Sequence, residues 1–98
     1  MIVHTVLFRF RPTCSEEDRL GLLGELSGLP SEFPAMRDWT MGVKESSRDD
    51  RFTHGFVVHF DTKDELESYL RSDRHEAFVA GPWTDAVEER AIVSYVVE

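Results

Sequence analysis

Two segments of this chain alternate as β-strands do, and each carries apolar side chains on both of its faces. The first runs from Ile2 to Phe10 and the second from Phe52 to Phe60. Because successive side chains of a strand point to opposite faces, the pattern predicts strands that are at least partly buried on both sides. A sheet built from such strands needs cover over each of its faces.

The segments between these strands predict two helices. Ser15 precedes three acidic residues, which is typical of an N-cap followed by side chains that complement the helix dipole. Gly28 and Pro30 predict the end of that helix, and Thr62 with Glu65 has the sequence of a capping box that opens the second. The remaining predicted elements are strands from Met36 to Lys44 and from Ala91 to Val97, a charged loop from Glu45 to Arg51, and a helical segment from Trp83 to Arg90 after a stop at Gly81 and Pro82.

The order strand, helix, strand, strand, helix, strand is that of the ferredoxin-like fold. This β-α-β-β-α-β arrangement is an α+β fold with a four-stranded antiparallel sheet and helices on one face. We expect a single domain over residues 1–98, near the lower end of the size range in which one hydrophobic core is enough to stabilise a fold. A hydrophobic content of 41% with 31% charged residues is typical of a soluble globular protein.

The helices can cover only one face of this sheet, yet the other face is also apolar. We assign to that open face Leu7, Trp39, Met41, Val43, Val57, Val93, Tyr95 and Val97. At about 1.5 kcal/mol or more for each side chain, leaving them in water would forgo an amount comparable with the stability of a domain, about 5 to 15 kcal/mol. We therefore expect a homodimer in which two open faces pack together as an α+β barrel. The alternative is a monomer with an unusually apolar exposed face.

The segment from Leu66 to Phe78 contains two side chains that can donate or accept a proton. Tyr69 lies on the inward face of the second helix, and Asp73 with Glu76 predicts an N-cap and a new helical start that presents His75. Six residues of continuous helix turn through about 600° at 3.6 residues per turn, which would leave Tyr69 and His75 about 120° out of line. If a new helix starts instead, the direction of the His75 side chain does not depend on the direction of Tyr69.

This pair predicts acid/base chemistry. The positive end of the new helix disfavours an imidazolium, so we expect a neutral His75, as a general base requires. Tyr69 could donate a hydrogen bond to a carbonyl oxygen that gains charge when a neighbouring carbon loses its proton. The combination suits enolisation followed by aldol or Claisen closure of a poly-β-keto chain, with no cofactor. The simpler alternative is that Tyr69 only packs and His75 is an exposed residue of a first helical turn.

His4 and His54 are expected on the helix-covered face of neighbouring antiparallel strands. Each lies near the start of its own strand, so they should be displaced by about four to six residues, on the order of 13 to 20 Å. We therefore expect no shared metal ion, and each histidine either lines one end of a pocket or is half-buried and bonded to a neighbour. The expected cavity between sheet and helices is bounded by His4, Val6, Phe8, Leu22, Leu26, His54, Tyr69, His75, Phe78 and Trp83.

Charge and motif content exclude several classes of protein. A formal charge of −8 would repel nucleic acid and anionic membranes rather than attract them. The sequence has no apolar run of the roughly 18 to 20 residues that span a bilayer, no signal-peptide pattern and one cysteine, so we expect a cytoplasmic protein without an internal disulfide. It also lacks a glycine-rich phosphate loop and a nucleophile elbow.

Four short motifs in order, HTVLFRF, FPAMRDW, FTHGFVVHF and YLRSDRHEAF, resemble the stress-responsive dimeric α+β barrel (Dabb) family. The resemblance implies a homodimer with the ferredoxin-like fold. In polyketide-cyclase members of this family, a histidine at the position of His75 is the catalytic base and a tyrosine at the position of Tyr69 assists it. Histidines at the positions of His4 and His54 line the cavity of such members, and Ser94 stands where they have an aspartate.

Three functional hypotheses follow. The first is a polyketide-cyclase-like enzyme that acts without a cofactor on a polyketide-like ligand, with His75 as base and Tyr69 as hydrogen-bond donor. The second is a non-catalytic homodimer that binds a small apolar ligand or serves in stress protection. The third is a cofactorless monooxygenase or haem-binding relative on the same barrel.

Overall fold

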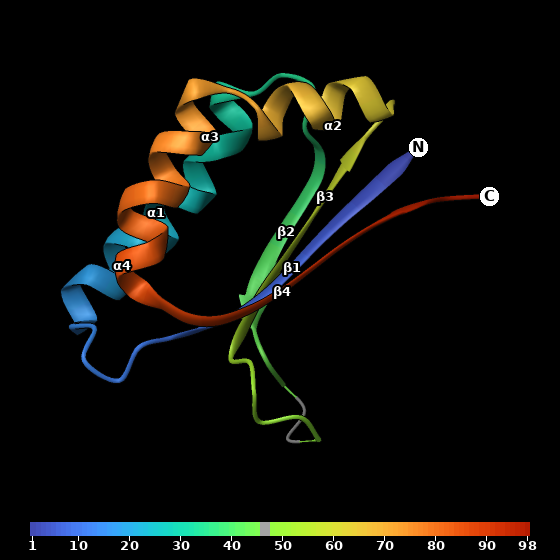
Figure 1. Cartoon of the computed structure of the whole chain (residues 1–98). Coiled ribbons are helices and arrows are strands. Elements are labelled where there is room, and N and C mark those ends of the chain that lie inside the picture. Colours follow the sequence, from blue (N-terminus) through green and yellow to red (C-terminus); the bar gives the residue numbers. More distant parts are fainter. Residues whose placement is uncertain (46–47) are drawn as a thin grey trace.

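A computed structural model describes residues 1–45 and 48–98, so residues 46–47 of the predicted loop Glu45–Arg51 lie outside the described part. The elements are β1 (Ile2–Phe10), α1 (Glu16–Glu32), β2 (Arg37–Val43), β3 (His54–Phe60), α2 (Lys63–Leu70), α3 (Asp73–Phe78), the π-helical turn η1 (Val79–Trp83), α4 (Thr84–Ala86) and β4 (Val87–Val96). The four strands form one antiparallel sheet in the order β2-β3-β1-β4. All helices lie on one face and leave the other bare (Figure 1). The predicted ferredoxin-like α+β fold is confirmed.

Strand β1 lies between β3 and β4 and fixes which side chains face the helices. His4 pairs with Val58 of β3 and with Ser94 of β4, and Phe8 pairs with His54. Paired residues of antiparallel strands point to the same face, so all five face the helices. The largest fully buried side chains under the helices are Phe8, Leu26, Leu29, Val58, Phe60 and Val87.

Both predicted N-terminal caps are present. The hydroxyl of Ser15 accepts a hydrogen bond from the backbone N–H of Asp18 at 3.1 Å. The hydroxyl of Thr62 accepts one from the N–H of Glu65 at 3.2 Å, and the Glu65 carboxylate accepts one from the N–H of Thr62 at 3.1 Å. These bonds satisfy N–H groups that a helix leaves unpaired at its start, which is why the local sequence is enough to locate both starts.

A β-bulge lies at the beginning of β2. Arg37 pairs with His59 but Thr40 pairs with Val57, so β2 contains one residue more than β3 over this stretch. Asp38 has a φ of 54° at this point, a conformation that aspartate adopts more readily than most residues. Because an extra residue exchanges the two faces of a strand, the bulge reverses the orientation of everything that follows in β2.

Three apolar residues of β2 consequently face the helices. Met41 pairs with Phe56 and Val43 with His54, both on the helix-covered face. The ring of Trp39 stacks on that of Phe56, with centroids 4.7 Å apart. The prediction that Trp39, Met41 and Val43 belong to the open face is therefore wrong. By register, the open face still holds Leu7, Val57, Val93 and Tyr95.

Helix α1 continues past its predicted end at Gly28 and Pro30 and reaches Glu32. Leu29 is fully buried against the sheet, and its carbonyl oxygen accepts a hydrogen bond from the N–H of Phe33 at 3.0 Å. The packing of Leu29 and this bond keep the chain helical through Pro30, which removes a single donor. The predicted end at Pro30 is wrong by one turn of helix or less.

The predicted stop at Gly81 and Pro82 is also wrong, because α3 runs through η1 into α4. A π-helical turn contains one extra residue and accommodates a proline within a continuing helix. The hydroxyl of Thr84 donates to the carbonyl oxygen of Val79 and helps close the turn. Trp83 is buried against the sheet, so packing keeps this segment in place.

Residues 87–90 form the start of β4, so the prediction of helix as far as Arg90 is wrong there. Val87 is fully buried and pairs with Phe10. The N–H of Arg11 donates to the carbonyl oxygen of Ala86 at 2.8 Å. Pairing with β1 thus extends the strand four residues earlier than the local sequence indicates.

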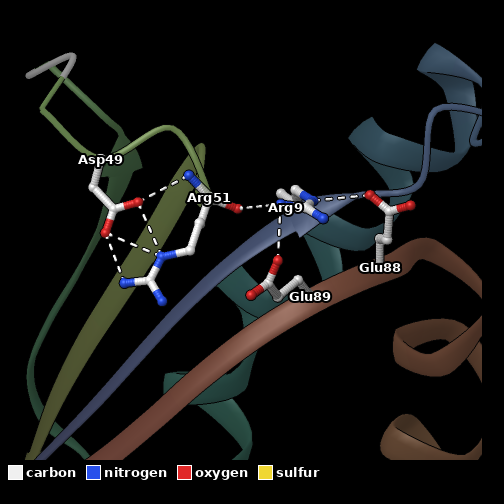
Figure 2. A network of polar contacts seen from close by, with 5 residues as sticks. All are labelled: Arg9, Asp49, Arg51, Glu88 and Glu89. Carbon is white, nitrogen blue, oxygen red and sulfur yellow. Dashed lines mark hydrogen bonds and ion pairs between the residues drawn. The ribbon is translucent and has the colours of Figure 1, made fainter.

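A network of charged groups joins the end of β1 to β4 and to the segment that precedes β3 (Figure 2). Arg9 binds Glu88 through Nε and Glu89 through Nη1, each at 2.8 Å. It also donates to the backbone carbonyl of Arg51 at 3.1 Å, and Arg51 pairs with Asp49 at 2.9 Å. The network engages both acidic side chains at the start of β4.

Candidate functional site

A cavity of about 380 Å³ lies between the helices and the β1–β4 side of the sheet. Most of its lining is apolar, with two histidines, a tyrosine, a serine and an arginine among the apolar groups. The lining residues are His4, Val6, Leu26, Phe56, Tyr69, Leu70, His75, Phe78, Val79, Trp83, Arg90, Ile92 and Ser94. An apolar cavity with a few convergent polar groups is the usual form of a small-molecule site.

The helix break that shapes this cavity is capped by Ser72, not by Asp73 as predicted. The Ser72 hydroxyl accepts a hydrogen bond from the N–H of His75 at 3.1 Å and donates one to the carbonyl oxygen of Tyr69 at 2.7 Å. Asp73 is the first residue of α3. Serine satisfies the free N–H of the third helical residue as well as aspartate does, so the sequence alone did not separate the two.

Ion pairs of Arg74 link α3 to α1 beside the break. Its Nε lies 2.8 Å from Oε1 of Glu32, and its Nη1 lies 3.5 Å from Oε2 of Glu25. The hydrogen bond from Arg74 lowers the pKa of the Glu32 carboxyl. These contacts add to the Ser72 cap in fixing the direction in which α3 leaves α2.

Across the break, the rings of Tyr69 and His75 are in contact. Their centroids lie 4.7 Å apart with an interplanar angle of 63°. The ring of His4 follows at 6.4 Å from that of Tyr69. Three residues from three elements, which the sequence indicated separately, therefore meet at one end of the cavity.

The hydrogen bond of His75 defines which ring nitrogen can act as a base. Its Nδ1 lies 3.0 Å from the carbonyl oxygen of Leu70, and a carbonyl can only accept, so Nδ1 carries the proton. In the neutral ring, Nε2 is then the acceptor. Burial lowers the pKa of His75, against the opposing effects of the Leu70 bond and Glu76. The expected neutral state is supported, with desolvation as the first cause.

Tyr69 is held as a protonated phenol by its surroundings. Burial raises its pKa to about 12, with a smaller opposing effect from Arg74. Its ring meets Phe33 edge-on at 5.0 Å and stacks on Phe60 at 5.8 Å. At neutral pH the hydroxyl is therefore a donor on a ring that packing holds in place.

His4 is buried, with 4% of its surface exposed, and has one polar partner. Its Nδ1 lies 2.7 Å from Oγ of Ser94, directly opposite on β4. Burial, and then the proximity of His75, lower the pKa of His4. Two neutral imidazoles thus face the same cavity.

Three predicted boundary residues do not line this cavity. Phe8 is fully buried beneath Trp83, with ring centroids 5.0 Å apart. His54 lies four positions away from His4 by register, stacks on Phe8 at 5.5 Å and bonds to the Thr53 hydroxyl at 2.8 Å. Leu22 borders a different groove.

That groove lies between α1 and the segment around α4 and measures about 580 Å³. Its lining includes four carboxylates, those of Glu17, Asp18, Glu25 and Asp85, and the thiol of Cys14. Although the groove is larger than the cavity, the described residues that line it include no histidine or tyrosine. The cavity, with its three contacting rings, is therefore the better candidate site.

Several lining residues were not indicated by the sequence. They are Phe56, Leu70, Val79, Arg90, Ile92 and Ser94. The alternation of β4 places Arg90, Ile92 and Ser94 on one face, and the pairing of Ser94 with His4 identifies that face as the helix-covered one. For the three residues of β4, the information that the sequence lacked was therefore the register of β4 against β1.

Within residues 1–45 and 48–98, we find no group of three or more histidine, cysteine, aspartate or glutamate side chains placed to hold a metal ion. The helices of this described part are also too short or too polar to cross a membrane.

The four-stranded antiparallel sheet, the helices on one face and the cavity between them define a ferredoxin-like α+β protein. The particular family follows from the sequence. The family model of the Stress responsive A/B Barrel Domain, Dabb, matches residues 2–97, and the chain belongs to this family. Among curated proteins, no match to this chain is found.

Solved structures with the same fold include an enzyme. A hydroxynitrile lyase from Passiflora edulis is 21% identical, with a TM-score of 0.90 over 99% of this chain and 93% of that one. A Dabb family protein from Mesorhizobium loti is 23% identical, with a TM-score of 0.87 over 99% and 96% of the two chains. A dimeric ferredoxin-like protein of unknown function from Thermobifida fusca is 22% identical, with a TM-score of 0.81 over 98% and 90%. Identities this low establish the shared fold alone.

Proposed function

We propose that this protein is a homodimeric acid/base enzyme of the polyketide-cyclase type, with His75 as general base and Tyr69 as hydrogen-bond donor. The observation that carries the proposal is the contact between the two rings, 4.7 Å apart, in one apolar cavity. A base and a donor must reach neighbouring atoms of the same substrate, and the contact between the two rings supports these roles.

The reaction would begin with removal of a proton from the carbon between two carbonyl groups. The free Nε2 of His75 takes that proton, and the Tyr69 hydroxyl donates a hydrogen bond to the carbonyl oxygen on which negative charge develops. The carbanion then attacks a second carbonyl of the same chain and forms the new carbon–carbon bond. The imidazolium returns its proton to the oxygen that becomes an alcohol, which restores neutral His75.

The surroundings favour each of these roles. Burial lowers the pKa of His75 and so keeps Nε2 unprotonated at neutral pH. Burial also raises the pKa of Tyr69 and keeps its hydroxyl a donor. The apolar lining would favour a folded form of a flexible chain, which lowers the entropic cost of ring closure.

The test is turnover of a short poly-β-keto thioester or acid by His75 variants. We expect His75→Ala and His75→Gln to lower turnover by at least about 100-fold, since positioned general bases contribute about 10² to 10⁴. The matched control is His59→Gln, because His59 lies on the open face of the sheet, paired with Val3. Turnover by His75→Ala equal to that of the unchanged protein, with the fold intact by circular dichroism, would contradict the proposal.

The homodimer is part of the proposal. The open face presents Val93 and Tyr95 at 59% and 52% exposure, and Leu7 at 40%. An apolar face of this extent is typical of an interface between subunits, and the Thermobifida fusca relative is described as dimeric. Two copies packed through this face would form the barrel.

A second candidate is cleavage or formation of a carbon–carbon bond next to a hydroxyl group. The same base can take a proton from an alcohol, and one relative is named a hydroxynitrile lyase. The apolar lining favours a third candidate, non-catalytic binding of a small apolar ligand. Release of cyanide from mandelonitrile would separate the second from the first, and ligand binding that is indifferent to His75→Gln, without turnover of either substrate, would favour the third.

A further inference from the structure

Arg90 is a cation at an apolar cavity. It lies on β4 opposite Phe8, on the helix-covered face, and lines the cavity together with Ile92 and Ser94. Within residues 1–45 and 48–98, its side chain makes no hydrogen bond, ion pair or ring contact. The other lining groups are apolar, apart from the two histidines, Tyr69 and Ser94.

Most other arginines of the chain have partners. Arg9, Arg37, Arg51, Arg71 and Arg74 pair with carboxylates, and Arg11 and Arg19 donate to backbone carbonyls. In a chain of net charge −8, carboxylates are abundant. Arg90 differs from these seven arginines because its guanidinium has neither a carboxylate nor a carbonyl partner.

The charged network of Figure 2 explains how Arg90 stays free of its nearest acids along the chain. Glu88 and Glu89 precede it directly, and Arg9 binds both of them at 2.8 Å. Strand alternation directs Glu89 and Arg90 to opposite faces. The two adjacent carboxylates are thus engaged elsewhere, and the guanidinium of Arg90 remains available to a ligand.

Resting on the proposed function, we propose that Arg90 binds the carboxylate of the ligand and that the cavity accepts an apolar oxo-acid. A guanidinium matches a carboxylate with two parallel hydrogen bonds. Arg90 lies four positions along β4 from Ser94, about 13 Å at about 3.3 Å per residue, and Ser94 is bonded to His4 beside Tyr69 and His75. The acid would be held at one end of the cavity and the reacting carbonyl at the other.

The net charge of the protein makes this contact decisive for specificity. A molecule of charge −8 repels an anionic ligand unless a local cation offsets the field. Arg90 supplies that cation at the cavity itself. A neutral ligand of the same shape gains nothing from it, so the guanidinium selects acids over amides and esters.

The test is isothermal titration of the whole protein with octanoate and with octanamide, which has the same chain but no charge. We expect octanoate to bind at least tenfold more tightly than octanamide. Arg90→Gln should remove this preference while changing octanamide affinity less than twofold, and Arg90→Lys should retain part of it. Arg71→Gln is the matched control, because it removes an equal charge from an exposed pair with Glu67 outside the cavity.

Equal binding of acid and amide, or a preference that survives Arg90→Gln, overturns the inference. Binding of neither compound overturns it as well. An octyl phosphate that binds tenfold more tightly than octanoate overturns the carboxylate assignment in favour of a phosphate. The catalytic proposal is judged separately by the His75 variants, whose turnover this titration does not measure, so failure of one can be told from failure of the other.

Discussion

The hydroxyl of Ser72 joins the two proposed catalytic residues, since it accepts a hydrogen bond from the N–H of His75 at 3.1 Å and donates to the carbonyl of Tyr69 at 2.7 Å. The same side chain therefore contacts the last turn of α2 and caps the start of α3. The break has a defined geometry, because the Ser72 oxygen binds one backbone group on each side of it, and the N–H of Ser72 also donates to the carbonyl oxygen of Tyr69 at 3.1 Å.

Replacement of Ser72 by alanine should therefore affect both stability and turnover. We expect Ser72→Ala to lower the free energy of unfolding by about 1 kcal/mol, the usual effect of losing an N-cap, and to lower kcat because His75 loses its fixed direction. Ser72→Thr keeps the hydroxyl and should retain most of both. Chemical denaturation and steady-state kinetics on the same preparations measure the two effects, and an unchanged kcat in a destabilised Ser72→Ala would show that the cap does not position His75.

Tyr69→Phe should separate the role of the hydroxyl from that of the ring. The ring contacts with Phe33 and Phe60 remain in the variant, so the fold should persist. Loss of a donor to a developing oxyanion should lower kcat by about 10²-fold. Tyr95→Phe on β4 removes the other tyrosine hydroxyl of the chain and is the control. Equal kcat values for the two variants would exclude Tyr69 as the donor.

Stability should fall as the pH drops below neutrality. Burial lowers the pKa values of His4, His54 and His75 from their ordinary value of 6.5. Between the folded and unfolded pKa values the unfolded chain binds more protons, so stabilisation present above pH about 6.5 is lost as the pH falls toward the folded values.

Thermal unfolding followed from pH 7.5 to pH 5 measures this loss. His4→Asn keeps a polar partner for Ser94 but removes one titrating group, so its melting temperature should depend less steeply on pH than that of the unchanged protein. A steeper dependence in His4→Asn, or a melting temperature that rises toward pH 5, would contradict the argument.

The two faces of the sheet should respond differently to an added charge. Val93 lies on the open face at 59% exposure and Val43 on the other face at 71%. We expect Val93→Lys to dissociate the dimer, because a lysine buried between two apolar sheets lacks a partner for its charge. Val43→Lys should leave the dimer intact. Light scattering coupled to size-exclusion chromatography measures the mass, and a monomeric mass for the unchanged protein would refute the interface.

Features with a local cause could be predicted from the sequence. The caps at Ser15 and Thr62 and the alternation of β1 and β3 each depend on residues within one turn or one strand. The break that carries Tyr69 and His75 was predicted for the same reason, although its cap was assigned to Asp73 and not to Ser72. The fold class followed from the order of these elements.

Features that depend on pairing between distant segments were decided only by the tertiary structure. The bulge at Asp38 turned Trp39 toward the helices, and burial of Trp83 carried the helix past Pro82. The register of β4 against β1 placed Arg90 and Ser94 in the cavity.

The order of the elements and the two residues proposed for catalysis could be predicted from the sequence, because caps, alternation and helical period are short-range effects. The position of Tyr69, His75 and His4 in one cavity that Arg90 borders could be seen only in the folded protein. The physical reason is that a strand exchanges its faces with each residue of register, and register is fixed by contacts between residues such as His4 and Ser94 that lie far apart in the chain.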